Sequence, residues 1–182
     1  MKISFKKIST ISILYLIISS NIFAQKPVEI IPNFKFYKLN KTLFTNKDLI
    51  SNTFSFFLFF DPNCDHCRLA IQKLNQHYLE CSQTTIYLIV AIEDAPNMIS
   101  FLNNYGPNLL NKKNIILLED MQAEFIKKFH PTKYPSIFLY SKKNRLMLYD
   151  DKAEGVNKLI EMIKSNFRSV GYSKSFRKEI IV

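Results

Sequence analysis

The chain has 182 residues, and 47% of them are hydrophobic, which is enough to bury a core without a scaffold of disulfides. Lysine and arginine outnumber aspartate and glutamate by 25 to 15, so the formal net charge is +10. The excess is scattered along the chain, which argues against nucleic acid as a partner. Its one concentration, in the basic tail 168–182, predicts no more than weak contact with a membrane surface.

Residues 1–24 are typical of a secretory signal peptide. Three lysines within the first seven residues precede a short apolar run, 8–18, and a small-residue stretch ends at Ala24. We expect cleavage after Ala24; an uncleaved membrane anchor is the alternative, but the run is shorter than the roughly 20 apolar residues that span a membrane. The sequence therefore predicts an exported, periplasmic protein with a single domain over 25–182, whose core covers about 30–167.

Hydrophobic periodicity predicts strands that alternate with helices over this domain. In chain order we expect a hairpin-like start over 31–45, a helical turn at 46–50, a strand at 54–60, a helix at 68–79, a strand at 84–92, a helix at 96–105, a strand at 114–118, a helix at 121–129, hairpin strands at 136–140 and 145–149, and a closing helix at 156–166. This order favours an α/β fold, a mixed β-sheet flanked by helices on both faces.

Two of these helices carry an expected apolar face. Leu69, Leu74 and Tyr78 recur at roughly helical spacing after the first long strand. The helix at 121–129 is expected to place four residues on one face, namely Met121, Phe125, Ile126 and Phe129.

The most informative motif is Cys64-Asp65-His66-Cys67. The buried strand before it is broken by Asp61-Pro62-Asn63, and a helix follows, so Cys64 lies at a helix N-terminus. There the unpaired backbone N–H groups and the helix dipole favour a thiolate, which is the nucleophile in disulfide exchange. The motif therefore predicts a redox-active cysteine pair.

Other interpretations of the cysteines stay open. Cys64, His66 and Cys67 are potential zinc ligands, but a closed zinc site has four ligands and Cys81 is poorly placed to be the fourth. A purely structural disulfide is a weak alternative, because closing a four-residue ring removes little chain entropy. For Cys81 we favour burial as a small apolar side chain over a mixed disulfide or an intermolecular link.

Taken together, these residues resemble the thioredoxin-like superfamily, and within it the exported TlpA and ResA type of thiol-disulfide oxidoreductase. The resemblance rests on the segments 31–34, 59–67, 117–120 with Phe129, and 134–139. It implies a thioredoxin-like mixed sheet with a strand and helix inserted between Cys67 and Pro135. It also implies that the Tyr134-Pro135 bond is cis beside the cysteine pair, and that Tyr134 lines a substrate groove. A trans proline at a strand start is the alternative.

The sequence also departs from this family. Asn63 replaces the usual tryptophan before the first cysteine, and the two acidic residues that assist proton transfer in relatives fall at Leu58 and Ala70. Another group must therefore move the proton during exchange, unless water does. The candidates by position are His66, Glu93 and Asp94.

The expected function is disulfide reduction or exchange in client proteins, without a cofactor. Cys64 attacks, Cys67 resolves the mixed disulfide, and Asp65 and His66 tune the pair. The expected partners are client thiols or disulfides and a membrane or soluble thiol donor. The alternative is a binding or chaperone module that keeps the thioredoxin fold without redox turnover.

Overall fold

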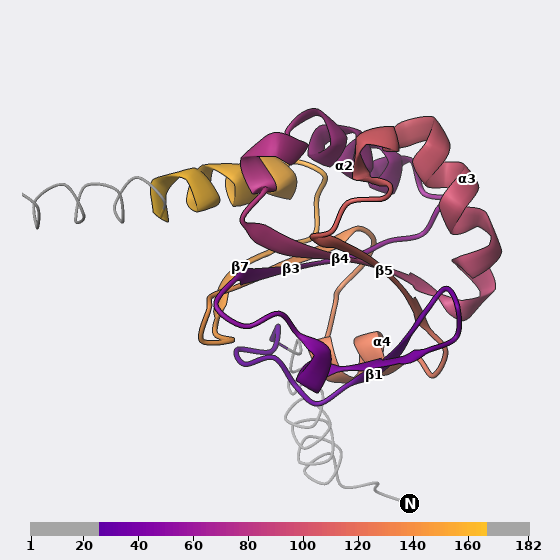
Figure 1. The fold of residues 1–182 in the computed structure, drawn as a ribbon, viewed down its shortest axis with the longest axis horizontal. Helices are drawn as coiled ribbons and strands as arrows, with labels where there is room; N and C mark the ends of the chain where they lie inside the picture. Colours follow the sequence, from indigo (N-terminus) through magenta and orange to yellow (C-terminus); the bar gives the residue numbers. More distant parts are fainter. Residues whose placement is uncertain (1–25, 167–182) are drawn as a thin grey trace, which may run out of the picture.

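Seven strands form one mixed sheet in the order β2-β1-β5-β4-β3-β6-β7 (Figure 1). The computed structural model describes residues 26–166, so the predicted signal peptide, 1–24, and the basic tail, 168–182, lie outside the described residues. The strands are β1 (Lys35–Lys38), β2 (Leu43–Thr45), β3 (Phe54–Phe59), β4 (Thr84–Ala91), β5 (Ile115–Asp120), β6 (Ser136–Tyr140) and β7 (Leu146–Asp150).

The centre of the sheet is parallel and its two sides are antiparallel. β3, β4 and β5 run in parallel, whereas β6 pairs antiparallel with β3 and β1 pairs antiparallel with β5. All six residues of β3 are buried, because helices or loops cover both faces of the sheet there. For this reason the sequence of β3 is an almost unbroken run of apolar residues. The predicted N-terminal hairpin is confirmed as β1 paired with β2.

Helices cover both faces, as the sequence predicted. They are α2 (Asp65–Gln76), α3 (Ala95–Tyr105), α4 (Glu124–Phe129) and a final helix over 155–166, with short 3₁₀ helices η1 (Asn46–Asp48), η2 (Tyr78–Cys81), η3 (Ile92–Asp94) and η4 (Pro107–Leu109). Figure 1 shows α2, α3 and the final helix on one face, and α4 with the N-terminal hairpin on the other. Between Cys67 and Pro135 the chain forms two strand–helix units, β4 with α3 and β5 with α4.

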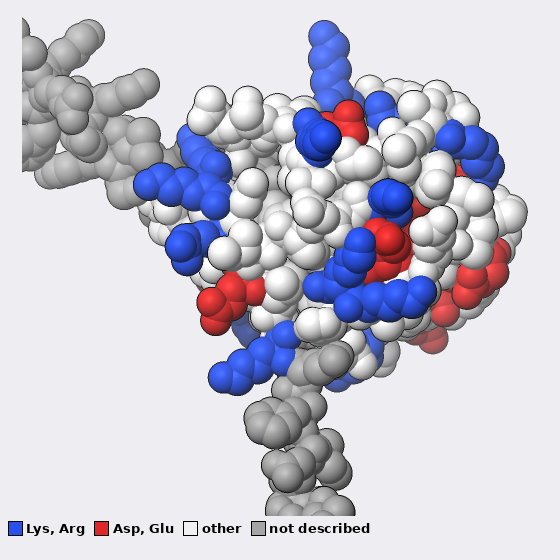
Figure 2. All heavy atoms as spheres, turned by 90° about the horizontal axis from the view of Figure 1, so that it is seen from below, with Lys and Arg blue, Asp and Glu red and all other residues white. Residues whose placement is uncertain are grey.

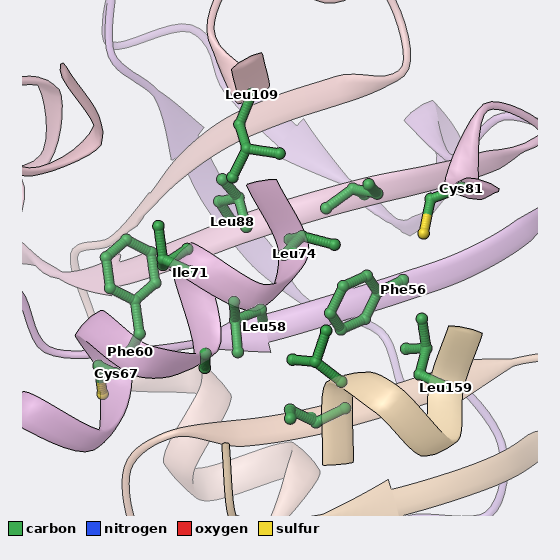
Figure 3. Packing of buried hydrophobic residues seen from close by; sticks show 14 of the residues in the cluster. Phe56, Leu58, Phe60, Cys67, Ile71, Leu74, Cys81, Leu88, Leu109 and Leu159 are labelled. Atoms are coloured by element: carbon green, nitrogen blue, oxygen red, sulfur yellow. The ribbon is translucent and has the colours of Figure 1, made fainter. Parts of the chain in front are cut away.

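The sheet separates two hydrophobic clusters. On the α2 face, Phe56, Leu58 and Phe60 pack with Ile71 of α2 and Leu159 of the final helix (Figure 3). The opposite cluster is mostly aromatic and includes stacked rings such as Phe125 and Phe129, whose centroids are 4.4 Å apart. Residues of β3 contribute alternately to the two clusters, which fixes the strand between its helices.

Two helix predictions need correction. The 121–129 helix begins only at Glu124, because the Asp120 carboxylate accepts hydrogen bonds from the backbone N–H groups of Glu124 and Phe125 and sets the start there. Met121 and Ile126 are therefore exposed, at 42% and 51%, and only the two phenylalanines of the predicted face are buried.

The apolar face of α2 is also rotated from the predicted one. Cys67, Ala70, Ile71 and Leu74 form the buried stripe, while Leu69 is 45% exposed. The helix begins at Asp65, so Cys67 itself is the first inward residue. No helix within 26–166 combines the length and the apolar character that crossing a membrane requires.

Candidate redox site

The carboxyl end of β3 places the cysteine pair at an edge of the sheet. After the strand, the Asp61 carbonyl accepts a hydrogen bond from the Cys64 N–H at 3.1 Å, and the Asp61 carboxylate accepts one from the Asn63 N–H at 2.7 Å. These two bonds turn the chain into α2. Cys64 is the N-cap residue of that helix, and its side chain makes no capping hydrogen bond. Its sulfur is therefore left available at the positive end of the helix dipole.

The two cysteines differ in access to solvent. Cys64 is partly exposed, whereas Cys67 is fully buried, and both are free thiols. Burial raises the pKa of the Cys67 thiol strongly; a backbone hydrogen bond from Asp61 lowers it, and a hydrogen bond with Cys64 raises it. The two thiols are thus near each other and are not bonded. This geometry suits a sequence in which Cys64 attacks from the surface and Cys67 follows from inside.

Asp65 and His66 occupy the exposed first turn of α2. Asp65 forms an ion pair with Arg68 at 3.0 Å, which offsets part of its charge near Cys64. The Arg68 guanidinium in turn lies 5.6 Å from the centre of the Tyr105 ring. Within the described part of the chain, His66 makes no hydrogen bond or ion pair, so its imidazole is free to approach a bound client.

Tyr134 and Pro135 come directly before β6, which pairs with β3, the strand that leads to the cysteines. The peptide bond between them is cis, in agreement with the sequence prediction. The Tyr134 ring packs on Phe59 with centroids 4.9 Å apart. Burial raises the pKa of the Tyr134 phenol to about 12, with smaller contributions from Asp94, Asp61, Glu93 and Cys67. The phenol is therefore within electrostatic range of the buried thiol.

A cavity opens beside Tyr134 on the α4 side of the sheet. Its volume is about 230 Å³, and its lining residues are Phe59, Ile126, Pro131, Thr132, Lys133 and Tyr134. The exposed Ile126 gives it an apolar wall. A cavity of this size holds one large side chain of an extended peptide.

Leu58 and Ala70, at the two positions where relatives carry an acid, are both fully buried in the hydrophobic cluster with Cys67. Glu93 and Asp94 follow β4 at the same edge of the sheet as the cysteines, because β3 and β4 are parallel neighbours. Asp61 was not among the site residues predicted from the sequence, although it closely follows the end of β3.

Cys81 is separate from this site. It is fully buried, as predicted, and Figure 3 shows it at the opposite end of the cluster from Cys67. Burial raises the pKa of its thiol to about 12. Over 26–166, the structure contains no group of three or more histidine, cysteine, aspartate or glutamate side chains arranged to hold a metal ion.

The surface charges are dispersed. Figure 2 shows lysine and arginine in separate groups on the α4 side of the molecule, with acidic and uncharged residues between them. Within 26–166 some lysines form ion pairs, such as Lys41 with Glu119 and Lys128 with Glu124. The face does not form the continuous basic stripe that nucleic-acid binding requires.

Comparison with solved structures shows that the fold is thioredoxin-like. A secreted Mycobacterium tuberculosis disulfide oxidoreductase, homologous to Escherichia coli DsbE, is 19% identical, with a TM-score of 0.59 over 72% of this chain and 95% of its own. StoA from Bacillus subtilis is 13% identical, with a TM-score of 0.55 over 74% and 98%. The exposed lipoprotein thioredoxin Etrx1 of Streptococcus pneumoniae is 11% identical, with a TM-score of 0.54 over 72% and 99%.

These similarities are structural. No protein-family model matches the sequence, and no curated protein matches it either. The function of this chain must therefore be argued from its own residues at the site.

Proposed function

We propose that the protein is an exported thiol-disulfide oxidoreductase that reduces or exchanges disulfides in client proteins. The observation that carries this proposal is the partly exposed Cys64 at the N-terminus of α2, with the buried Cys67 nearby in the first turn of the same helix. A helix N-terminus favours the thiolate that disulfide exchange needs. The secreted oxidoreductase and the exposed lipoprotein thioredoxin among the structural neighbours support both the chemistry and export.

The reaction proceeds in two exchanges. The Cys64 thiolate attacks a client disulfide, forms a Cys64–client disulfide and releases the second client sulfur as a thiolate, which takes up a proton. The Cys67 thiol then loses its proton and attacks the Cys64 sulfur. This forms the Cys64–Cys67 disulfide and releases the first client sulfur, so the client gains the two electrons that the pair loses. A thiol donor reverses these steps on the protein.

The client is held beside the pair by Tyr134 and Pro135. An extended client segment that lies along these residues brings its disulfide to the Cys64 sulfur, and the cavity of about 230 Å³ accepts one of its apolar side chains. His66 and Asp65 flank Cys64 and set the balance between its reduced and oxidised states. Asp65 is already paired with Arg68, so His66 has the larger influence.

The direct test is the equilibrium reduction potential of the Cys64/Cys67 pair against glutathione. It is measured in the Cys81→Ala variant, so that Cys64 and Cys67 are the only cysteines that can exchange with glutathione. A value near thioredoxin's roughly −270 mV identifies a reductant that is fed by a thiol donor, and one near DsbA's roughly −120 mV identifies an oxidant or isomerase. His66→Gln should shift the value, whereas the exposed and distant His77→Gln should not. A pair that never exchanges with glutathione would favour the binding module instead.

A further inference from the structure

The loop between α4 and β6 forms most of the cavity on the α4 side of the sheet. Four consecutive loop residues, 131–134, line this cavity together with Phe59 of β3 and Ile126 of α4. The first residue of β6, Ser136, pairs with Phe59, five positions before Cys64. The cavity therefore lies at the end of β3 that leads to the cysteines, and the position of the loop sets the width of the cavity.

Side chains hold this loop in place, because its backbone is unpaired. Within 26–166, residues 131–134 make no hydrogen bond from backbone to backbone. At the end of the loop nearer β6, the hydroxyl of the fully buried Ser136 donates to the Lys133 carbonyl at 2.5 Å. A segment without backbone pairing opens at little cost in free energy, so its side-chain contacts decide where the loop lies.

Three groups that bond to one another hold the middle of the loop. The Thr132 N–H donates to the Tyr149 hydroxyl at 3.0 Å, and the Thr132 hydroxyl donates to the Asp151 carboxylate at 2.6 Å. The Thr132 hydroxyl has only one proton, so the Tyr149 hydroxyl is the donor in the 2.8 Å bond between the two hydroxyls. Each donor therefore has an acceptor, and Thr132, Tyr149 and Asp151 form a clamp. Lys133 adds an ion pair with Asp151 at 3.7 Å.

The two partners of Thr132 belong to the edge of the sheet. Tyr149 lies in β7 opposite Phe138 of β6, and the centroids of the two rings are 4.8 Å apart. Phe138 in turn packs edge-on against two phenylalanines of α4. Asp151 directly follows β7. The clamp therefore ties the loop to the packed aromatic cluster.

We propose that Tyr149 and Asp151 are positioning residues that make the site selective for clients with a large apolar side chain beside the reacting cysteine. The inference rests on the proposed function, because it concerns which client reaches Cys64. The clamp keeps the cavity wide enough for such a side chain, which binds there because it leaves water. Without the clamp the loop moves, and the cavity no longer distinguishes a large side chain from a small one. Neither residue lines the cavity, so both act through Thr132.

Two peptide disulfides that differ only beside their cysteine test this selectivity. In each, the cysteine is joined to a nitro-aromatic thiol, whose thiolate absorbs visible light once Cys64 has attacked. The residues on both sides of the cysteine are phenylalanine in one peptide and alanine in the other. Each peptide is mixed in excess with the reduced full-length protein that carries Cys81→Ala. The half-saturating peptide concentration then reports binding, and the maximal rate reports attack.

The test variant is Tyr149→Phe, which removes only the hydroxyl of the clamp. In the wild type, the half-saturating concentration should be on the order of tenfold lower for the phenylalanine peptide, the effect of burying one large side chain. In Tyr149→Phe this ratio should fall below about threefold, while the maximal rate changes by less than about twofold. Asp151→Ala should give the same result. The matched control is Tyr78→Phe, which loses a hydroxyl bond to Asn114 and should keep the wild-type ratio.

Substitutions at Thr132 show whether the three groups act together. Thr132→Val keeps the shape of the side chain but loses the hydroxyl, and it should lower the ratio as much as Tyr149→Phe does. The double variant should lose no more than either single one, because both substitutions break the same contact. Thr132→Ser keeps the hydroxyl and should retain the wild-type ratio. Independent losses that add in the double variant would overturn the clamp.

A disulfide without a peptide separates the inference from the proposed function. A symmetric nitro-aromatic disulfide reports attack by Cys64 without client side chains, and Tyr149→Phe should keep the wild-type rate within about twofold. A wild type no faster than a free thiol would overturn the proposed function. If the wild type reacts faster but shows no preference for the phenylalanine peptide, or if Tyr149→Phe keeps the full preference, only the inference is overturned. An equal loss of preference in Tyr78→Phe would also overturn it, by assigning the effect to overall stability.

Discussion

Buried cysteines lie near both ends of helix α2, and their chemical settings differ. Cys67 is in the first turn of α2, whereas Cys81 is in η2, beyond its last residue. At the N-terminal end of α2, Cys67 lies near a second thiol, that of the partly exposed Cys64. Beyond its other end, Cys81 lies in η2, beside the hydrogen bonds of the Asn114 side chain. The Asn114 amide donates to the carbonyls of Cys81 and Thr84, at 3.3 and 2.9 Å, and accepts from the Tyr78 hydroxyl at 2.8 Å.

This contrast shows that burial does not by itself make a cysteine redox-active. Burial raises the pKa of both thiols and would leave either of them inert. The N-terminal end differs in two respects: it has a partly exposed partner thiol, and a helix N-terminus lies beneath that thiol. At the opposite end, the three hydrogen bonds of the Asn114 side chain stabilise the fold.

The sharpest way to break the contrast is to remove the attacking thiol. Cys64→Ser should slow the reduction of a peptide disulfide on the order of a thousandfold or more, to the rate without protein, because the hydroxyl is not a comparable nucleophile. Cys81→Ala should keep the wild-type rate within about twofold, since Cys81 lies in the distant core. Reduction that persists in Cys64→Ser would assign the chemistry elsewhere.

Alkylation compares the reactivity of the two ends directly. With a pKa of about 12, the Cys81 thiol is about one ten-thousandth thiolate at pH 8, and that fraction rises tenfold with each pH unit. We expect iodoacetamide to modify Cys64 in the folded protein and Cys81 only after unfolding, with the modified residues identified by mass spectrometry. Modification of Cys81 at the same rate as Cys64 would contradict its placement in the core.

A substitution at the paired end should affect stability and not chemistry. Asn114→Ala removes three hydrogen bonds and should lower the free energy of unfolding by about 2 kcal/mol, measured by denaturant titration. The exposed Asn108→Ala is the matched control and should cost less than about 0.5 kcal/mol. Both variants should reduce a peptide disulfide at the wild-type rate. A rate loss in Asn114→Ala alone would link the two ends of α2.

The smallest expected effect is that of Asp94→Asn on the free energy of unfolding. Because the pKa of Asp94 is raised in the folded protein, the folded state binds the proton more tightly, and stability is lost as the pH rises through that pKa. Asp94→Asn should therefore be more stable than the wild type at pH 7, by less than about 1 kcal/mol because most of the carboxyl meets water. The difference should vanish below the unfolded pKa of about 3.9. A variant that is less stable at pH 7 would indicate a stabilising contact.

Much of the fold was predictable from local patterns. The strands, the N-terminal hairpin, the position of Cys64 at a helix start and the burial of Cys81 follow from periodicity and turn residues. The predicted start of the 121–129 helix was wrong because the start depends on the Asp120 carboxylate, which accepts hydrogen bonds from the backbone N–H groups of Glu124 and Phe125. Periodicity carries no information about a bond made across a turn.

The site was predictable only in part. The cysteine pair and the Tyr134-Pro135 bond were singled out from their motifs, but the role of Asp61 in turning the chain from β3 into α2 was not. The parallel alignment of β3 with β4 also brings the segments that follow the two strands to one edge of the sheet. Spacing along the chain gives no sign of which strands are neighbours.

Trapping the mixed disulfide tests the central claim most directly. Reduced protein that carries Cys67→Ser and Cys81→Ala is incubated with a peptide disulfide, and the intact mass is measured alongside that of Cys64→Ser with Cys81→Ala. We predict that the first variant gains one peptide, attached to Cys64, and that the second gains none. An adduct on Cys67 in the second variant, or no adduct on Cys64 in the first, would contradict the assignment of Cys64 as the nucleophile.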